Sequence, residues 1–195
     1  FDKFYIRTTN PNIANFWNES YKGISKCNMV LDKINGVTID NSRKDQLTKE
    51  VKFLLGLMYF NLVRIFGGVP LVTSNVQIAD AYAIARSSQA ETYAQVIKDL
   101  TDAEALPASY TGNDVGRATS GAVKALLGTV YMNMKDYAKG ETKLAEVVSS
   151  GKYSLLENTP GSLNITGYEK IFDQTNHNHK ESIFDVQFKK GGFGE

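Results

Sequence analysis

The sequence predicts a mainly all-α protein built from tetratricopeptide-like helical pairs. Apolar residues recur every three or four positions over most of the chain, which is the period of a helix with one buried face. The phrase Leu-Leu-Gly-x-x-Tyr also occurs twice inside such stretches, in LLGLMYF (54–60) and in LLGTVYM (126–132). Alternation of apolar and polar residues is confined to the C-terminal region. We therefore expect only a short strand or an irregular segment there.

The first two helices are predicted over residues 11–35 and 43–66. On the apolar face of the first we place Trp17, Tyr21, Ile24, Asn28 and Leu31. Asn28 is polar, so we expect it to hydrogen-bond a neighbouring helix or loop. The second helix is apolar on two faces, which indicates burial between neighbours. It should end at Gly67-Gly68.

Three further helices are predicted over residues 88–106, 119–134 and 136–150. Ser88 and Glu91 have the spacing of a capping box at the start of the first of these. Gly151 is the expected stop of the last one.

Loops are predicted over residues 70–86 and 108–118. The C-terminal alternation involves Phe184, Val186 and Phe188, and it predicts a short strand near 183–189.

The two helical glycines need a physical reason, because glycine in a helix interior costs about 1 kcal/mol relative to alanine. That cost is acceptable where a second helix must approach the backbone closely. Tyr59 follows Gly56, and Tyr131 follows Gly128, by nearly one helical turn, so each pair shares one side of its helix. We predict that these four residues pack helix pairs together.

Leu-Gly-x-x-Tyr is typical of the first helix of a tetratricopeptide repeat. Around Gly128 the match continues, with the small Gly140 and the bulky Leu144 at the expected places, although Lys124 replaces the usual tryptophan. The match around Gly56 is weaker, because a loop follows it. An ordinary helix bundle is the alternative explanation.

Composition sets bounds on function. With 195 residues the chain can bury about 70% of its unfolded surface, so we predict a single domain over 1–195. The net charge of +1 gives no general attraction to nucleic acid, and no apolar run is long enough to span a membrane. Cys27 lies in a helical pattern and is expected to be a small core residue. The abrupt start and end suggest a fragment of a longer protein.

No catalytic or cofactor motif occurs, so we expect neither an enzyme nor a cofactor. His177 and His179, with Asp173 or Glu181, have a spacing that allows metal binding, but a solvated turn is the simpler interpretation and we predict no metal. For the acidic residues of one helix we expect a solvated face; these are Asp99, Asp102 and Glu104.

Exposed aromatic rings suit carbohydrate binding, because sugar faces stack on them. Phe4, Tyr5, Tyr82 and Tyr110 lie in predicted loops and are candidate ligand-binding residues. Local packing is the simpler explanation for each of them.

The segment VKFLLGLMYFNLVRIFGGVPLV (51–72) resembles the signature of the SusD/RagB family, which usually reads Phe-Leu-Arg-Ala, two variable positions, then Tyr-Phe-x-Leu-Val-Arg-x-Phe-Gly-Asp-Val-Pro-Leu. Four more blocks agree in order: FWNESYKGISKCNMVLDKI, AETYAQVIKDLTDAEALP, GRATSGAVKALLGTVYMNMKDYAKGETKLAEVVSSGKYSL and KESIFDVQF. Leu55, Gly56 and Gly68 depart from the family's usual Arg, Ala and Asp, at positions that we interpret as structural.

This resemblance implies a nutrient-binding accessory protein of a SusC-like TonB-dependent transporter, with a glycan as the expected nutrient. Family members are lipoproteins exposed on the outer-membrane surface, and their fold is a scaffold of tetratricopeptide-like pairs followed by an irregular half. The chain resembles the first, helical part of that fold, without the lipid-bearing cysteine and the later half. The resemblance assigns no binding residue here.

A tetratricopeptide-like scaffold for protein–protein interaction is the alternative function. No convergent polar pocket is visible in the sequence. We therefore expect these residues alone to bind glycan weakly or not at all, and to retain a surface for a protein partner.

Overall fold

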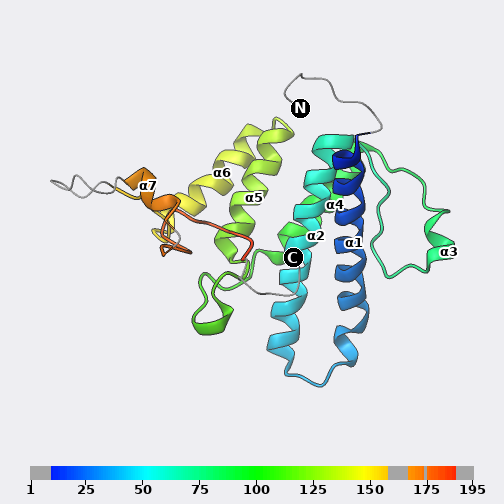
Figure 1. The fold of residues 1–195 in the computed structure, drawn as a ribbon, viewed down its shortest axis with the longest axis horizontal. Coiled ribbons are helices and arrows are strands. Elements are labelled where there is room, and N and C mark those ends of the chain that lie inside the picture. The colour runs from blue at the N-terminus through cyan, green and yellow to red at the C-terminus, as the bar shows by residue number, and fades with distance from the viewer. Residues whose placement is uncertain (1–9, 158–166, 174, 188–195) are drawn as a thin grey trace. The chain divides into compact units, whose positions relative to one another are not determined.

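The computed structural model describes residues 10–157, 167–173 and 175–187, apart from the side chain of Ile78. The described elements are α1 (Pro11–Lys33), η1 (Ile34–Gly36), α2 (Asn41–Phe66), α3 (Ile78–Ala81), α4 (Gln89–Ala103), η2 (Gly112–Asp114), α5 (Ser120–Asn133), α6 (Tyr137–Ser149) and α7 (Gly167–Ile171) (Figure 1). Within these residues no β-strand forms, and the all-α class with paired helices is confirmed.

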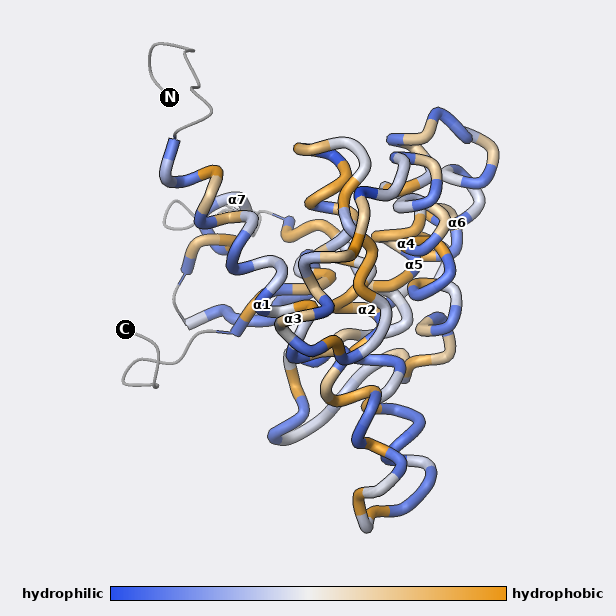
Figure 2. Tube along the Cα trace, turned by 90° about the vertical axis from the view of Figure 1, so that its right-hand side faces the viewer, coloured by the Kyte–Doolittle hydropathy of each residue, from blue (hydrophilic) through white to orange (hydrophobic). Residues whose placement is uncertain are grey.

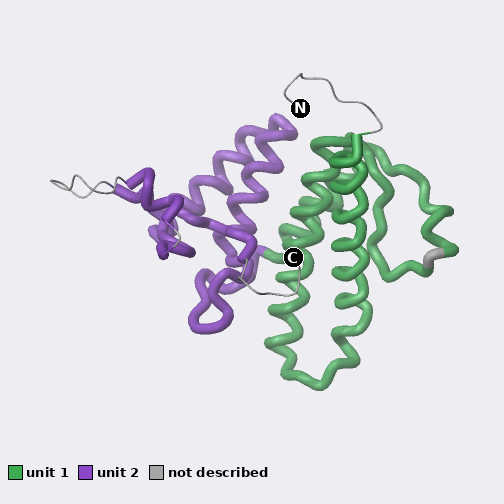
Figure 3. The backbone as a smooth tube through the Cα atoms, viewed as in Figure 1, with its two compact units in different colours: residues 1–103 green, residues 104–195 purple. Residues whose placement is uncertain are grey.

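The chain divides into two compact units, residues 1–103 and 104–195 (Figure 3). Each unit is described by itself below. The single domain expected over residues 1–195 stays a prediction. No helix in the described ranges has the length and apolar character that crossing a membrane requires.

In the first unit, α2 packs against both α1 and α4. Figure 1 shows α1 and α2 side by side. This arrangement confirms the burial expected for a helix with two apolar faces. The largest side chains of this core are almost completely buried; they are Ile24, Phe53, Tyr59, Phe60, Leu62 and Leu100. Figure 2 shows apolar and polar residues interleaved along the helices, as expected when one face of each is buried.

Helix ends follow the sequence signals. The Asn10 side chain accepts a hydrogen bond from Asn12 N–H at the start of α1, and Asp40 Oδ1 accepts one from Arg43 N–H at the start of α2. Gly67 ends α2 with φ 71°, a left-handed conformation that glycine adopts without strain.

The predicted capping box at the start of α4 is confirmed. Ser88 N–H donates to Glu91 Oε2 at 2.7 Å, and Glu91 N–H donates to Ser88 Oγ at 3.2 Å. The Ser88 hydroxyl also donates to Glu91 Oε2 at 2.7 Å. The bonds that the carboxylate accepts from this hydroxyl and from Ser88 N–H lower the pKa of Glu91, since they stabilise its ionised form.

The glycine of α2 faces α4. A Cβ atom added to Gly56 would lie 2.7 Å from two side-chain carbons of Leu100, too close for any real contact. The partner helix is therefore α4, which follows α2 only after a loop of about twenty residues. That intervening loop explains why the repeat pattern around Gly56 looked incomplete in the sequence.

In the second unit, α5 and α6 form a helical hairpin (Figure 1). A Cβ atom on Gly128 would lie 2.6 Å from Leu144 Cγ, and one on Gly140 would lie 2.9 Å from Met132 Sδ. The two glycines face each other, since either Cβ would also lie 3.4 Å from the other glycine's carbonyl oxygen. Side chains at both positions would push the helices apart.

Of the two alternatives expected near the C-terminus, the irregular segment is confirmed for the residues described there, and the short strand near 183–189 does not form in them. Residues 183–187 are irregular, and Val186 is exposed instead of half-buried. A strand needs a pairing partner, and the described residues supply none. The side chains make turn contacts instead, because Asp185 accepts from the Ser182 hydroxyl and Gln187 bonds Asn178.

Two short helices, α3 and α7, were not predicted. They are four and five residues long, too short to show a helical period in sequence.

Candidate functional site

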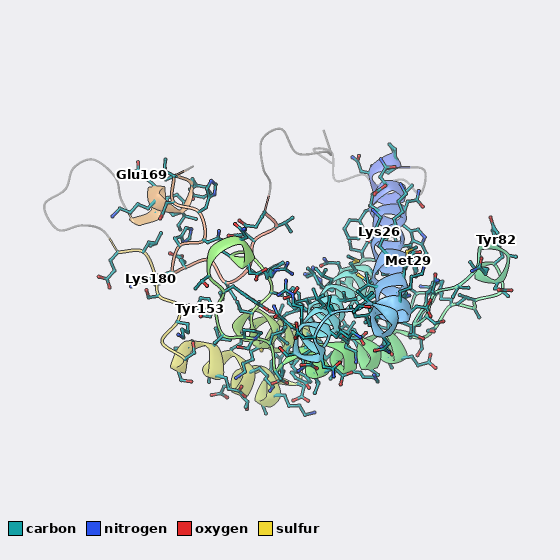
Figure 4. All side chains as sticks on the ribbon, turned by 90° about the horizontal axis from the view of Figure 1, so that it is seen from below. Lys26, Met29, Tyr82, Tyr153, Glu169 and Lys180 are labelled. Atoms are coloured by element: carbon teal, nitrogen blue, oxygen red, sulfur yellow. The ribbon has the colours of Figure 1, made fainter. Side chains whose placement is uncertain are left out.

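A pocket of about 230 Å³ lies within the second unit. Its walls come from the loop 108–119, from residues 152–153 and from residues 178–185. Side chains on these walls that can stack on a ligand or donate hydrogen bonds to it include Tyr110, Arg117, Lys152, Tyr153, His179 and Lys180. Figure 4 labels Tyr153 and Lys180 in this region.

Local geometry explains how the loop 108–119 forms one wall. Gly116 has φ 95°, and an added Cβ atom would lie 2.5 Å from the Gln187 side chain, so only glycine fits there. Next to it, Arg117 Nε donates to Asp114 Oδ1 at 2.5 Å across one turn. The hydroxyls of Thr119 and Tyr153 are 3.0 Å apart and hydrogen-bonded, which joins this wall to the segment after α6.

The third wall is fixed mainly by backbone contacts. Ser154 N–H donates to the Lys180 carbonyl at 3.0 Å, and Ser182 N–H donates to the His179 carbonyl at 2.9 Å. His179 Nδ1 accepts from Glu181 N–H at 3.2 Å, so the proton of the neutral ring sits on Nε2. The imidazole therefore offers a donor at Nε2.

The first unit holds a different feature, the loop over residues 67–88 between α2 and α4. Hydrogen bonds hold it at both ends, and it is called the pinned loop below. Tyr21 donates to the Pro70 carbonyl at 2.8 Å, and Asn28 Nδ2 donates to the Val72 carbonyl at 2.7 Å. The Tyr59 hydroxyl donates to the same Val72 carbonyl at 3.1 Å and accepts from Val72 N–H at 2.8 Å. The expected bond from Asn28 to a neighbouring loop is thus confirmed.

The other end of this loop is held by Arg86. Its guanidinium donates to the Gly68 carbonyl at 2.6 Å and to the Phe66 carbonyl at 2.7 Å. Between the pinned ends, Tyr82 follows α3 and is 90% exposed (Figure 4). The ends of the loop are therefore held in place, and the Tyr82 ring between them is exposed to solvent.

Burial changes the ionisation of the groups that hold the loop. It raises the pKa of Tyr59 to about 12 and also raises that of Tyr21, so both hydroxyls stay protonated as donors. Burial likewise raises the pKa of the Cys27 thiol, which disfavours the reactive thiolate.

The expected solvated acidic face on α4 is wrong at Asp99, which is only 5% exposed. It lies on the face of α4 that packs against α2, and it accepts from Gln95 Nε2 at 2.8 Å. Burial raises the pKa of Asp99. Together with Lys52, Tyr59, Gln95 and Lys98, Asp99 lines a second pocket of about 270 Å³.

The other two acidic residues make ion pairs. Asp102 accepts from Lys52 and, at 3.4 Å, from Lys98, and the bond from Lys52 lowers the pKa of Asp102. Glu104 accepts from Lys143 at 2.6 Å.

The four candidate aromatic residues have separate positions. Phe4 and Tyr5 lie outside the described residues. Tyr82 belongs to the pinned loop of the first unit, whereas Tyr110 is half-buried and lines the pocket of the second unit. Among the described residues, no group of three or more His, Cys, Asp or Glu side chains is arranged to hold a metal ion.

The residues named for helix packing also take different roles. Gly56 and Gly128 lie at close helix contacts, whereas Tyr59 is buried in the core and its hydroxyl bonds the pinned loop. Tyr131 is half-buried, with the Lys139 ammonium 5.5 Å from its ring centre.

Sequence reasoning missed Lys152, Tyr153 and Lys180. They lie far from Tyr110 in the chain, and no local motif links three loop segments that meet only in the folded unit. The expectation that no polar pocket exists is therefore corrected. The weak glycan binding expected from it stays a prediction.

Comparisons with known proteins by sequence and by structure all find SusD-like proteins. Residues 3–132 match the SusD-like family described as "starch-binding associating with outer membrane". SusD-like protein P25 of Formosa agariphila is 26% identical over 91% of this chain. The crystal structure of a SusD-like protein from Bacteroides fragilis superposes with a TM-score of 0.83, at 36% identity over 96% of this chain.

A third relative is described by its ligand. A laminarin-binding SusD-like protein is 31% identical, with a TM-score of 0.77 over 87% of this chain and 36% of its own. The chain likewise spans 32% of the length of the Formosa protein and 36% of the Bacteroides fragilis protein. The relatives that carry a functional description are described as binding proteins and not as enzymes. The helical pairs and the match over residues 3–132 together show that this chain belongs to the SusD-like family.

Proposed function

We propose that this chain is the helical part of a glycan-binding accessory protein that serves a SusC-like TonB-dependent transporter. The observation that carries the proposal is the family match over residues 3–132, whose description names both starch binding and association with the outer membrane. The laminarin-binding relative, which shares the fold at 31% identity, supports a glycan as the nutrient. The protein would act at the cell surface as an outer-membrane lipoprotein, with a lipid anchor outside these residues.

The pocket of the second unit supports the same function. Tyr110 and Tyr153 offer rings for stacking on a sugar, and the polar side chains around them offer donors for its hydroxyl groups. Tyr82 on the pinned loop is a separate exposed ring suited to a second contact. Sugar binding needs several such contacts at once, so a protein with both parts of the family fold should bind more tightly than this chain alone.

The test is a glycan array probed with this chain and with a longer protein that contains it, followed by calorimetry on the best ligand. We expect a defined group of glycans to bind, with the longer protein binding more tightly. Tyr110→Ala should weaken binding by about 1 kcal/mol or more if the ring stacks on the sugar. Absence of any glycan ligand for both proteins would contradict the proposal.

A scaffold for protein–protein interaction is the second candidate. The observation that favours it is the pair of glycine contacts, Gly56 with Leu100 and Gly128 with Leu144, which are typical of stacked helical repeats. A protein ligand bound by the chain in the absence of any glycan ligand would favour this alternative.

A further inference from the structure

The pocket of the second unit carries an unbalanced charge. Three cationic side chains line it, Arg117, Lys152 and Lys180, against the single carboxylate of Asp185. The chain as a whole is close to neutral, with a net charge of +1. The positive charge is therefore confined to the pocket. At physiological salt it attracts an anionic ligand only within about 8–10 Å.

Some of these charges are already compensated. Arg117 is paired with Asp114 at 2.5 Å, and Asp185 accepts a hydrogen bond from the Ser182 hydroxyl. Lys152 and Lys180 have no ion-pair partner among the residues that the structure describes. These two ammonium groups therefore remain available to an anionic ligand.

The neutral groups of the same pocket suit a sugar ring. Tyr110, Tyr153 and Phe184 are half-buried, which limits their movement and leaves part of each side chain accessible. The Tyr153 hydroxyl is occupied by Thr119, so this ring contributes mainly apolar surface. His179 adds a donor at Nε2, because its Nδ1 is occupied by Glu181 N–H.

We propose that this pocket binds an acidic saccharide, with Lys152 and Lys180 at its carboxylate or sulfate group and the Tyr110 ring against the sugar face. The inference rests on the proposed glycan-binding function and adds the chemical class of the ligand. The pocket of the first unit contrasts with it, because its two lysines, Lys52 and Lys98, both bond Asp102, and the carboxyl group of Asp99 lines the same pocket. Ammonium groups without an ion-pair partner among the described residues therefore distinguish the pocket of the second unit from this one.

The test compares trisaccharides of equal length that differ in charge: galactotriose, trigalacturonic acid and a sulfated galactotriose. Binding to the 195-residue chain and to a longer protein that contains it is measured by calorimetry. We expect both acidic sugars to bind more tightly than galactotriose, by about 5-fold for each ammonium group engaged. The preference should shrink when NaCl is raised from about 50 mM to about 500 mM, because salt screens exposed charges. The comparison of the two acidic sugars distinguishes a carboxylate from a sulfate ligand.

Lysine variants test which side chains cause the preference for acidic sugars. Lys152→Ala and Lys180→Ala should each weaken binding of the preferred acidic sugar by about 5-fold and leave galactotriose unchanged. Lys180→Arg should restore most of the affinity, since it keeps the charge. Lys26→Ala is the matched control: it removes an exposed lysine from α1 in the other unit, lowers the net charge equally and should leave all affinities unchanged (Figure 4).

Three results would overturn the inference. Equal binding of neutral and acidic trisaccharides, unaffected by the lysine variants, would leave the glycan function standing and remove its acidic specificity. Inorganic sulfate or a short polyglutamate peptide that binds as tightly as the acidic sugar would show an anion site that does not recognise sugar. If neither the 195-residue chain nor a longer protein that contains it binds any of these sugars, while both show cooperative thermal unfolding, the inference and a glycan site within these residues are both overturned.

Discussion

Tyr59 shows how one side chain can join a helix to a loop. It follows the helix-contact glycine Gly56 in the sequence, and the pattern alone assigned it to helix packing. In the structure it is buried, and its hydroxyl both donates to and accepts from the backbone of Val72. The repeat pattern could predict that Tyr59 is buried, but the loop that it bonds has no sequence signal.

The first prediction concerns this hydroxyl. Tyr59→Phe leaves the ring in place but removes the partner of Val72 N–H, so the free energy of unfolding should fall by about 1–2 kcal/mol. Urea unfolding measures the change. Tyr82→Phe removes a hydroxyl from an exposed ring and should change stability by less than about 0.5 kcal/mol. Equal effects of the two variants would show that Tyr59 does not hold the loop.

The second prediction uses two carboxylates of α4 whose pKa values shift in opposite directions. The pKa of Asp99 is raised by burial, so its native state is destabilised as pH rises from the ordinary value of 3.8 through the raised value. The pKa of Asp102 is lowered by Lys52, so its contribution is present above 3.8 and is lost as pH falls through the lowered value.

Asp99→Asn should therefore gain stability relative to the unaltered chain as pH rises from about 3 to about 7, whereas Asp102→Asn should lose it over the same window. Unfolding in urea at several pH values gives both differences. A gain for Asp102→Asn, or a loss for Asp99→Asn that grows with pH, would show that these environments are wrongly assigned.

Helix pairs are the elements that carry this fold, and their glycines set how closely the helices approach. Gly128 and Gly140 face each other across α5 and α6, and Gly56 faces Leu100 across α2 and α4. The second pair could not be recognised with certainty from sequence, because the loop between α2 and α4 interrupts the usual helix–turn–helix spacing.

The third prediction tests the contact at Gly128. Gly128→Leu should reduce the free energy of unfolding by about 1–3 kcal/mol, because the new side chain overlaps Leu144. Combining Gly128→Ala with Leu144→Ala should recover part of the loss seen for Gly128→Ala alone. Gly36→Leu is the control, because no other group lies within 4 Å of an added Cβ atom there. An unchanged melting temperature for Gly128→Leu would contradict the close helix contact.

At the scale of the whole molecule, the helices were predictable and the pockets were not. Helical periodicity and capping residues such as Ser88 and Glu91 act over a few neighbouring positions, so they can be read locally. The pocket of the second unit joins Tyr110 to Lys180 through tertiary contacts alone. The same limit explains Asp99, since a helical face is known to be buried only when its partner helix is known.

The fourth prediction tests the central claim, that this chain belongs to an accessory protein of a SusC-like transporter. The measurement is co-expression of the tagged chain with a SusC-like TonB-dependent transporter of the same organism, followed by purification in detergent and gel filtration. We expect the two proteins to elute together in a stoichiometric complex, since helical pairs offer broad surfaces for a protein partner. Separate elution of a folded chain and a folded transporter, for both this chain and a longer protein that contains it, would contradict the account.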